Sequence, residues 1–210
     1  VTLSPEQLDI FQKIRDNSKE SKDFVDVMGG IKEYQVGKGK PPQDISMKNN
    51  RVFNSTEKKD ATFVKEVRGK HVFPFVLRWE NEYVSYGPWL AEPRNPKFFI
   101  GPRIFVRQIP GKERLYCAYT EDDYIVDQSA YIIKPKSEDL ENFRSLEGIL
   151  NSNLIFWYYR NQNNEFDTLF PKIKSGEIKV LPISSENLDK NLAQKADLML
   201  SLNEQLQDLT

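Results

Sequence analysis

The chain has 210 residues, 39% hydrophobic and 12% aromatic, so it can bury the core of one sizeable domain or of a domain with an appendage, and wholesale disorder is excluded. No apolar run approaches the roughly eighteen residues of a membrane-spanning helix, and the first residues lack the basic and apolar regions of a signal peptide. The single cysteine, Cys117, cannot form an internal disulfide and fits a reducing compartment. We therefore expect a cytoplasmic protein with no membrane partner.

The net charge of −1 hides an uneven distribution. Residues 30–116 carry 17 Lys or Arg against 9 Asp or Glu, a balance of +8. Residues 1–29 carry 4 against 6, and residues 117–210 carry 9 against 16, so these flanks stand at −2 and −7. Such a split is typical of a polyanion-binding face on an otherwise acidic scaffold.

The first predicted element is a helix. The sequence SPEQ at residues 4–7 offers a serine N-cap, a proline at the first helical position and a glutamine that completes a capping box. Apolar residues follow at one-turn spacing, which predicts a helix to about Asn17. Residues 24–28 then predict a short strand that ends at Gly29.

Residues 31–60 are polar and rich in Lys and Asn. Their middle, GKGKPP at 37–42, is not a phosphate-binding loop, because it lacks the GxxxxGK[ST] spacing and two prolines stand where a helix would begin. A mobile basic loop of this length inside a compact domain is more often functional than decorative.

The following region is predicted to be mostly antiparallel β-structure. Residues 72–79 and 83–86 suit two paired strands with residues 80–82 as their turn, and residues 115–119 and 129–133 are two further candidates. An acidic turn at residues 121–123 separates the last two.

Residues 83–109, YVSYGPWLAEPRNPKFFIGPRIFVRQI, are the most distinctive stretch. Prolines brace the first half as a rigid loop, and the second half alternates as a strand with Arg103, Phe105 and Arg107 on one face. This face suits phosphate or carboxylate binding, although an ordinary edge strand with a solvated basic face would carry the same pattern.

The period then becomes helical. Residues 137–159 predict one helix capped by Ser137, residues 170–173 and 178–183 are short apolar pieces, and a last helix begins near residue 185. That helix carries a leucine seam, which we expect to pack along another helix. The predicted fold is mixed α+β, a mostly antiparallel twisted sheet with flanking helices. The predicted division is an N-terminal helix at 1–19, a recognition domain at 20–184 and a helical arm at 185–210.

The sequence predicts no catalytic residue and no metal site. His71, the only histidine, has no cluster of ligands beside it, and Cys117 lies in an apolar strand. The acidic residues at 121–123 fit a solvated turn better than a cation site.

The ordered motifs resemble the TaqI-like C-terminal specificity domain of type IIG restriction–modification enzymes and DNA adenine-N6 methyltransferases. The matching pieces are Gly30-Ile31, VGKGKPPQ (36–43), VRGKHV (67–72), the stretch at 83–109, CAY (117–119), LEGILNSNLIFWYYR (146–160), LFPKI (169–173) and IKVLPI (178–183). His71 stands where this family usually has an acid after RGK.

The resemblance implies a domain that docks on double-stranded DNA beside an N-terminal methyltransferase domain of the same parent chain. The parent would use S-adenosylmethionine, and Mg²⁺ for cleavage, whereas this chain needs no cofactor of its own. Shared motifs are more suited to scaffold than to base readout, so we expect the bases to be read from the variable residues 44–66 and their surroundings. Candidate phosphate contacts are Lys38, Lys40, Arg68, Lys70, Arg94, Arg103 and Arg107; candidate base-reading residues are Gln43, Asn49, Asn50, Arg51 and Lys58.

Two other functions fit the same sequence. The chain could be a protein-interaction module of a phage-defence complex that uses its terminal helices. It could also be a single-strand or RNA-binding module that stacks bases on its aromatic residues. Tyr86 and Trp89 could stack on a flipped base, but the surrounding prolines favour a role in bracing the loop.

Overall fold

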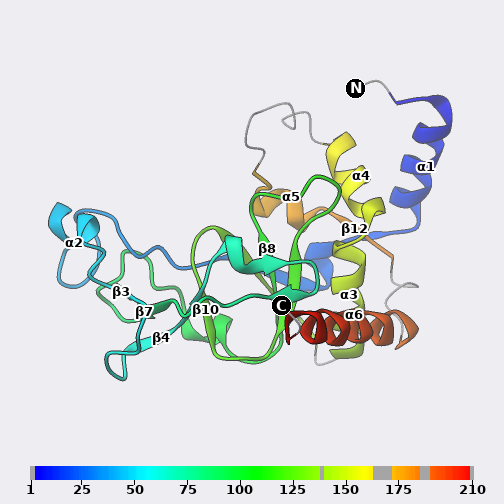
Figure 1. Ribbon diagram of the computed structural model, residues 1–210. Coiled ribbons are helices and arrows are strands. Elements are labelled where there is room, and N and C mark those ends of the chain that lie inside the picture. Colours follow the sequence, from blue (N-terminus) through cyan, green and yellow to red (C-terminus); the bar gives the residue numbers. More distant parts are fainter. Residues whose placement is uncertain (1–2, 138–139, 163–171, 185–189, 209–210) are drawn as a thin grey trace.

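The computed structural model describes residues 3–137, 140–162, 172–184 and 190–208. Figure 1 shows strands at the centre, helices gathered on one side and a smaller lobe on the other. The helices are α1 (Pro5–Asp16), α2 (Ile45–Asn49), α3 (Leu140–Leu150), α4 (Asn153–Gln162), α5 (Ser175–Lys179) and α6 (Lys190–Asp208), with 3₁₀ turns η1 (Ser21–Asp23), η2 (Gly69–His71) and η3 (Pro96–Phe99). The strands are β1 (Lys19–Glu20), β2 (Val25–Gly29), β3 (Asn54–Ser55), β4 (Phe63–Val67), β5 (Val72–Phe73), β6 (Val76–Leu77), β7 (Tyr83–Ser85), β8 (Arg103–Arg107), β9 (Cys117–Thr120), β10 (Tyr124–Val126), β11 (Ala130–Pro135) and β12 (Pro182–Ile183).

Two four-stranded sheets form the centre of the fold. The first has the order β2-β11-β8-β9 with antiparallel neighbours, and one of its faces packs on α3, α4 and α5 through residues such as Ile104 and Val106. Its other face packs through Phe105 and Ile132 toward the second sheet, of order β10-β4-β7-β3. The fold is thus mixed α+β and mostly antiparallel, as predicted, with β10 parallel to β4.

Strand β8 is buried on both faces because it lies in the middle of its sheet. It pairs with β11 on one side and β9 on the other. Ile104, Phe105 and Val106 are each 0% exposed, and so is Arg103. The alternative of an edge strand with a solvated basic face is therefore wrong for this strand.

The N-terminal helix begins as predicted. Ser4 Oγ accepts a hydrogen bond from the Gln7 amide at 3.3 Å, and the Ser4 amide donates to Gln7 Oε1 at 2.9 Å, which together form the capping box. Phe11 stacks on Tyr158 of α4 with ring centroids 4.2 Å apart. This contact attaches α1 to the helical side of the molecule.

The single helix expected at 137–159 is wrong in its middle, because α3 ends at Leu150 and α4 begins at Asn153. Ser152 Oγ accepts a hydrogen bond from the Ile155 amide at 3.2 Å and so starts the second helix. Asn151 turns its side chain to β9, with bonds of 3.1 and 3.0 Å to the Cys117 amide and carbonyl. The expected first turn, at 138–139, lies outside the described residues.

Helix α3 also closes the outer edge of the first sheet. Glu147, one turn before Asn151, accepts a hydrogen bond from the Tyr119 amide at 2.8 Å, so one side chain of α3 and one just after its end satisfy the backbone of β9. Both are 2% exposed. These two side chains thereby bond to backbone groups of β9 that a neighbouring strand would otherwise satisfy.

Helix α6 packs on α3 through its small residues, of which Ala193 and Ala196 are buried, and Asp197 forms an ion pair with Arg144 at 2.8 Å. Met199 and Leu202, from the predicted seam, are 41% and 50% exposed. The expected start near residue 185 lies outside the described residues, and the division at 19/20 and 184/185 stays a prediction. None of the described helices is both long and apolar enough to cross a bilayer.

The strands expected at 72–79 and 83–86 do not pair with each other. Residues 72–77 form a small hairpin of β5 and β6, whereas β7 pairs with β4 and β3. The supposed loop at 31–60 also contains α2 and β3. Of the two short apolar pieces, half of the first, residues 170–171, lies outside the described residues, and the second covers the end of α5 and β12.

The opposite edge of the first sheet, β2, is open. The Gly30 amide donates to the Ala130 carbonyl at 3.2 Å and the Lys136 amide to the Phe24 carbonyl at 3.0 Å, so the even-numbered residues of this strand bond to β11. Because ladder bonds alternate, the odd-numbered residues 25, 27 and 29 direct their backbone groups away from the sheet.

Candidate nucleic-acid interface

The lobe at the left of Figure 1 contains α2, β3, β4 and β7, and several exposed cations lie along the sequence that forms it. We call residues 36–65, which contain α2 and β3 and run into β4, the basic segment. Its exposed cations are Lys38, Lys40, Lys48, Arg51, Lys58, Lys59 and Lys65, against the exposed acids Asp44, Glu57 and Asp60. Among the described residues, none of these seven cations has an ion-pair partner. Their charge is therefore available to a ligand.

The first part of the basic segment is a rigid loop that holds Lys38 and Lys40 outward. Buried Gln43 ties it down: its Nε2 donates to the Glu33 and Trp89 carbonyls at 2.7 Å each. Gly39 has a φ of +86°, and a Cβ there would lie 2.2 Å from the Trp89 carbonyl oxygen, so only glycine fits. The loop is well hydrogen-bonded, its expected mobility stays a prediction, and Gln43 has a structural role.

The second part is the α2 turn. Asp44 caps α2 by accepting a hydrogen bond from the Met47 amide at 2.9 Å. Asn49, Asn50 and Arg51 follow at its end with exposed side chains, and Lys58 is exposed in the next turn. Asn49, Asn50 and Arg51 thus lie together on one exposed turn region, Lys58 follows beyond β3, and Gln43 is buried.

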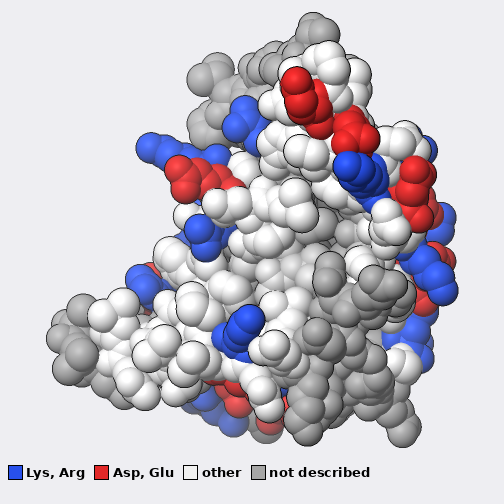
Figure 2. Space-filling model, turned by 90° about the vertical axis from the view of Figure 1, so that its right-hand side faces the viewer, with Lys and Arg blue, Asp and Glu red and all other residues white. Residues whose placement is uncertain are grey.

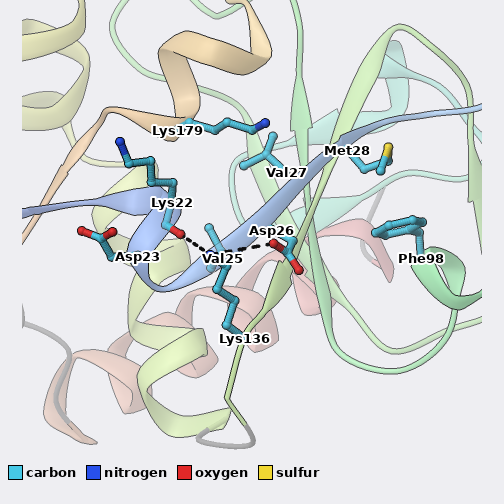
Figure 3. Close-up of a pocket in the computed structure, with 9 residues that line it drawn as sticks. All are labelled: Lys22, Asp23, Val25, Asp26, Val27, Met28, Phe98, Lys136 and Lys179. Atoms are coloured by element: carbon cyan, nitrogen blue, oxygen red, sulfur yellow. Dashed lines mark hydrogen bonds and ion pairs between the residues drawn. The ribbon is translucent and has the colours of Figure 1, made fainter.

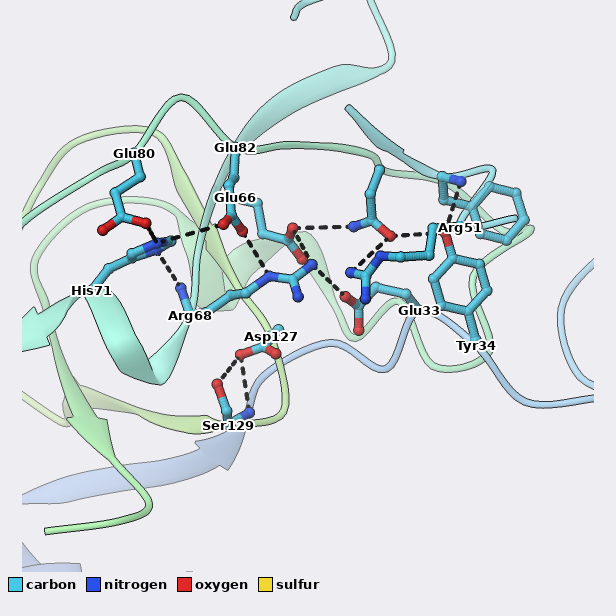
Figure 4. Close-up of polar contacts among 12 residues, drawn as sticks. Glu33, Tyr34, Arg51, Glu66, Arg68, His71, Glu80, Glu82, Asp127 and Ser129 are labelled. Carbon is cyan, nitrogen blue, oxygen red and sulfur yellow. Dashed lines mark hydrogen bonds and ion pairs between the residues drawn. The ribbon is translucent and has the colours of Figure 1, made fainter. Parts of the chain in front are cut away.

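Behind the basic segment lies a buried ionic network centred on Arg68 (Figure 4). Its Nη2 is 2.9 Å from Glu66 Oε2 and 3.4 Å from Glu33 Oε1, and its Nε is 2.9 Å from Glu82 Oε2. Burial and the neighbouring Glu33 raise the pKa of Glu66, which is 0% exposed. Since Arg68 neutralises these carboxylates inside the lobe, we leave it out of the proposed phosphate contacts.

Next to this network, His71, Glu80 and Glu82 bring possible metal ligands within 4.8 Å of one another. The Lys70 ammonium already lies 2.7 Å from Glu80 and 2.6 Å from Glu82, where a cation would bind. The Arg68 amide donates to His71 Nδ1 at 3.0 Å, so the ring hydrogen of the neutral imidazole is on Nε2, 3.3 Å from Glu80. Burial lowers the pKa of His71 and favours this neutral form. With both nitrogens engaged, His71 offers no lone pair to a metal.

The remaining candidate phosphate contacts have partners within the protein. Arg94 Nε donates to the Gly30 carbonyl at 3.0 Å, and its Nη1 pairs with Glu92 at 2.7 Å. Arg103 donates to the Gly101 carbonyl at 2.7 Å and to the Asp122 carbonyl, and burial lowers its pKa to about 10. Arg107 is half-buried over the Tyr116 ring, with 5.5 Å between its Cζ and the ring centroid. These arginines hold loops and strands together.

The two aromatics of the proline-rich loop brace it. Tyr86 donates to the Arg94 carbonyl at 3.1 Å, and Trp89 Nε1 donates to the Ser85 carbonyl at 2.8 Å. Both pack against the second core cluster. A Cβ at Gly87 would lie 2.4 Å from the Trp89 ring, so the glycine allows the indole to fold back on its own loop.

Other surfaces of the molecule suit a polyanion less well than the basic segment does. The face that carries α1 and α4 is largely uncharged at its centre, with lysine, arginine and carboxylate groups mixed along its margins (Figure 2). An apolar groove of about 680 Å³ between α1 and α6 opens there, lined by Ile10, Ile14 and Leu154 among others. Neither feature suits a polyanion.

A second groove, of about 610 Å³, follows the open edge of β2 and has Lys22, Lys136 and Lys179 around it (Figure 3). Asp23 and Asp26 also line this groove, and Lys136 lies 3.9 Å from Asp26. It is therefore more nearly charge-balanced than the basic segment.

The chain is similar to known proteins over most of its length. Residues 64–183, more than half of the chain, match the family model of the TaqI-like C-terminal specificity domain. The chain belongs to this family. A protein of Methanocaldococcus jannaschii, named a putative type II restriction enzyme and methyltransferase, is 24% identical across 98% of the chain. The chain spans 17% of the length of that relative.

The family match covers only part of this specificity domain. The matched region begins in β4, so nearly all of the basic segment precedes it. It contains α3–α5 and most of the residues of the two cores, whereas core residues such as Val25 and Ile31 precede it.

Sequence reasoning missed three exposed cations of the specificity domain. Lys48 lies on α2, Lys59 lies 5.6 Å over the Phe63 ring, and Lys65 lies 4.8 Å over the Trp79 ring. Alternation along β4 does not mark Lys65 as exposed, because Phe63 and Val67, which share its face of the strand, are buried. Lys48 could not be assigned while α2 went unrecognised.

Proposed function

We propose that this chain recognises a specific sequence in double-stranded DNA for a restriction–modification enzyme, an adenine-N6 methyltransferase with linked endonuclease activity. The basic segment docks on the duplex. Lys38, Lys40 and Lys48 contact phosphates, while Asn49, Asn50, Arg51 and Lys58 approach base edges in the major groove.

One observation carries this proposal: a member of the TaqI-like specificity family has seven exposed, unpaired cations on a segment that lies almost wholly outside the matched scaffold. Lysines supply sequence-independent attraction to phosphate, and asparagine and arginine supply the paired donors and acceptors that distinguish bases. A recognition domain requires both kinds of group on one surface.

The remaining machinery belongs to the rest of a longer protein. The relative from Methanocaldococcus jannaschii, about six times longer than the matched region, bears a name that includes methyltransferase and restriction enzyme. We propose an N-terminal methyltransferase domain as the partner, with S-adenosylmethionine and Mg²⁺ bound there. Recognition by this chain uses neither.

The test is fluorescence anisotropy of this chain with a random-sequence duplex pool over a salt series. We expect log affinity to fall linearly with log salt, with a slope that corresponds to roughly four to eight phosphates at about 0.9 each. The double variant Lys38→Ala, Lys40→Ala should reduce the slope by about 1.8 and weaken binding to all sequences evenly.

The matched control is the double variant Lys22→Ala, Lys179→Ala, in the groove along β2. Its slope should equal that of the wild type. If the control lowered the slope and the Lys38/Lys40 variant did not, the duplex would bind along β2 and not on the basic segment, and the proposal would be wrong. A preference for single strands, or no binding at low salt, would refute duplex recognition by this chain.

A further inference from the structure

Asn54 connects the exposed turn region to the buried network. Its Oδ1 accepts hydrogen bonds from the Tyr34 hydroxyl at 2.8 Å and from Arg51 Nη2 at 3.3 Å, and its Nδ2 donates to Glu66 Oε2 at 3.2 Å. Because both ends of the amide are engaged, its orientation is fixed. Arg68 in turn holds Glu66 at 2.9 Å, so the chain of contacts ends in the core of the lobe.

Tyr34 fixes the same junction from the other side. Its ring stacks on Phe53 with centroids 5.3 Å apart, and its hydroxyl accepts a hydrogen bond from the Phe53 amide at 2.8 Å while donating to Asn54. Burial raises the pKa of Tyr34 to about 12, so the hydroxyl keeps its hydrogen at neutral pH and can serve both partners. Figure 4 shows Tyr34 beside Arg51 at the end of the network.

Arg51 differs from the other exposed cations of the basic segment in being held in place. Its backbone is left-handed, with a φ of +48°, and one guanidinium nitrogen is bound to Asn54 while the side chain is exposed. Of the five N–H donors on an arginine, most are left for a ligand. The lysines nearby carry flexible point charges, whereas this guanidinium has a planar fork with a defined anchor.

We propose that Arg51 reads a guanine in the recognised DNA sequence and that Asn54 and Tyr34 are positioning residues that aim its guanidinium. The proposal rests on the proposed function of duplex recognition. Guanine offers O6 and N7 side by side in the major groove, which an arginine fork meets with two parallel hydrogen bonds. Such a contact needs a defined direction, and the Asn54 anchor supplies it.

The experiment is selection from a random duplex pool with the wild type and the variants Arg51→Lys and Tyr34→Phe. Lysine keeps the charge but lacks the fork. We expect Arg51→Lys to reduce the preference for guanine at one position by about tenfold and to leave the salt slope unchanged. Tyr34→Phe should reduce the same preference by about threefold, because the hydrogen bonds of the hydroxyl to Asn54 and to the Phe53 amide are both lost. The controls Lys22→Ala, in the groove along β2, and Tyr158→Phe, on α4, should preserve every base preference.

Four results decide the matter, with each variant first confirmed as folded by thermal melting. Loss of a single guanine preference in both variants supports the proposal. A selected motif whose guanine preference survives Arg51→Lys overturns it and leaves duplex recognition intact. Equal loss at every position in Tyr34→Phe overturns the positioning role. If the wild type selects no motif, the proposed function itself has failed.

Discussion

The buried carboxyl of Glu147 gives a sharp test of the fold, through the substitution Glu147→Gln. Glu147 is 2% exposed, and burial raises its pKa to about 7, against an ordinary value of 4.5. Its carboxyl accepts a hydrogen bond from the Tyr119 amide, and the side-chain oxygen of a glutamine can accept the same bond. The substitution therefore removes the titration while retaining the contact that closes the edge of β9.

The direction of the pH dependence of stability follows from the raised pKa. Between pH 4.5 and 7 the folded protein binds more protons than the unfolded chain, so stability falls as pH rises through this window. One unit of pKa difference corresponds to about 1.4 kcal/mol. The raised pKa of Glu147 therefore lowers the free energy of unfolding by less than about 1 kcal/mol at pH 5 and by about 3 kcal/mol at pH 8. Wild type should therefore lose about 2.5 kcal/mol more than Glu147→Gln across this range.

The assay is urea denaturation followed by tryptophan fluorescence at pH 5, 6, 7 and 8. Other titrating groups are common to both proteins and cancel in the difference. The exposed Glu113→Gln variant is the control and should keep the wild-type dependence on pH. Parallel stability curves for wild type and Glu147→Gln would refute the assignment of a costly buried carboxylate to α3.

Two further predictions concern the lobe and the junction between the sheets. Arg68→Ala should lower the free energy of unfolding by about 3 kcal/mol in urea denaturation, since it leaves buried Glu66 unpaired, whereas Lys70→Ala, at a half-exposed pair, should cost less than about 1 kcal/mol. Similar losses for the two variants would contradict the structural role of Arg68. Gly30→Ala should destabilise by about 2 kcal/mol in thermal denaturation, because a Cβ would lie 2.1 Å from a backbone oxygen; Gly176→Ala, with nothing within 4 Å, should be close to neutral or stabilising. An unchanged melting temperature for Gly30→Ala would show that the close approach is absent.

Local chemistry accounts for what the sequence predicted well. The capping box at Ser4 depends on four consecutive residues and appears as expected. The strands near Val25, Cys117 and Ala130 also form, because alternation and apolar runs are local signals. The basic charge of the central segment was visible as well, since charge needs no structure to be counted.

The errors share one physical cause, which is that pairing between distant segments leaves no local mark. Arg103 looked solvated because nothing nearby in the sequence shows that β9 and β11 flank it. The break after Leu150 depends on Asn151 reaching across to β9, some thirty-four residues away in sequence. The sequence also does not show which cations pair with carboxylates inside the protein. Only the structure shows that Arg68 pairs with Glu66 and Arg94 with Glu92, whereas the cations of the basic segment stay exposed.

The open edge of β2 has a consequence for how the protein behaves at high concentration. An unpaired strand edge is a template on which a second copy can add its own strand, the route to sheet-to-sheet aggregation. Here the groove along that edge is rimmed by Lys22, Lys136 and Lys179, with Asp26 exposed on the strand itself. Two copies that approached edge to edge would have to strip water from these lysines and from Asp23 and Asp26. The charged rim therefore disfavours strand addition at an edge that its own sheet leaves uncovered.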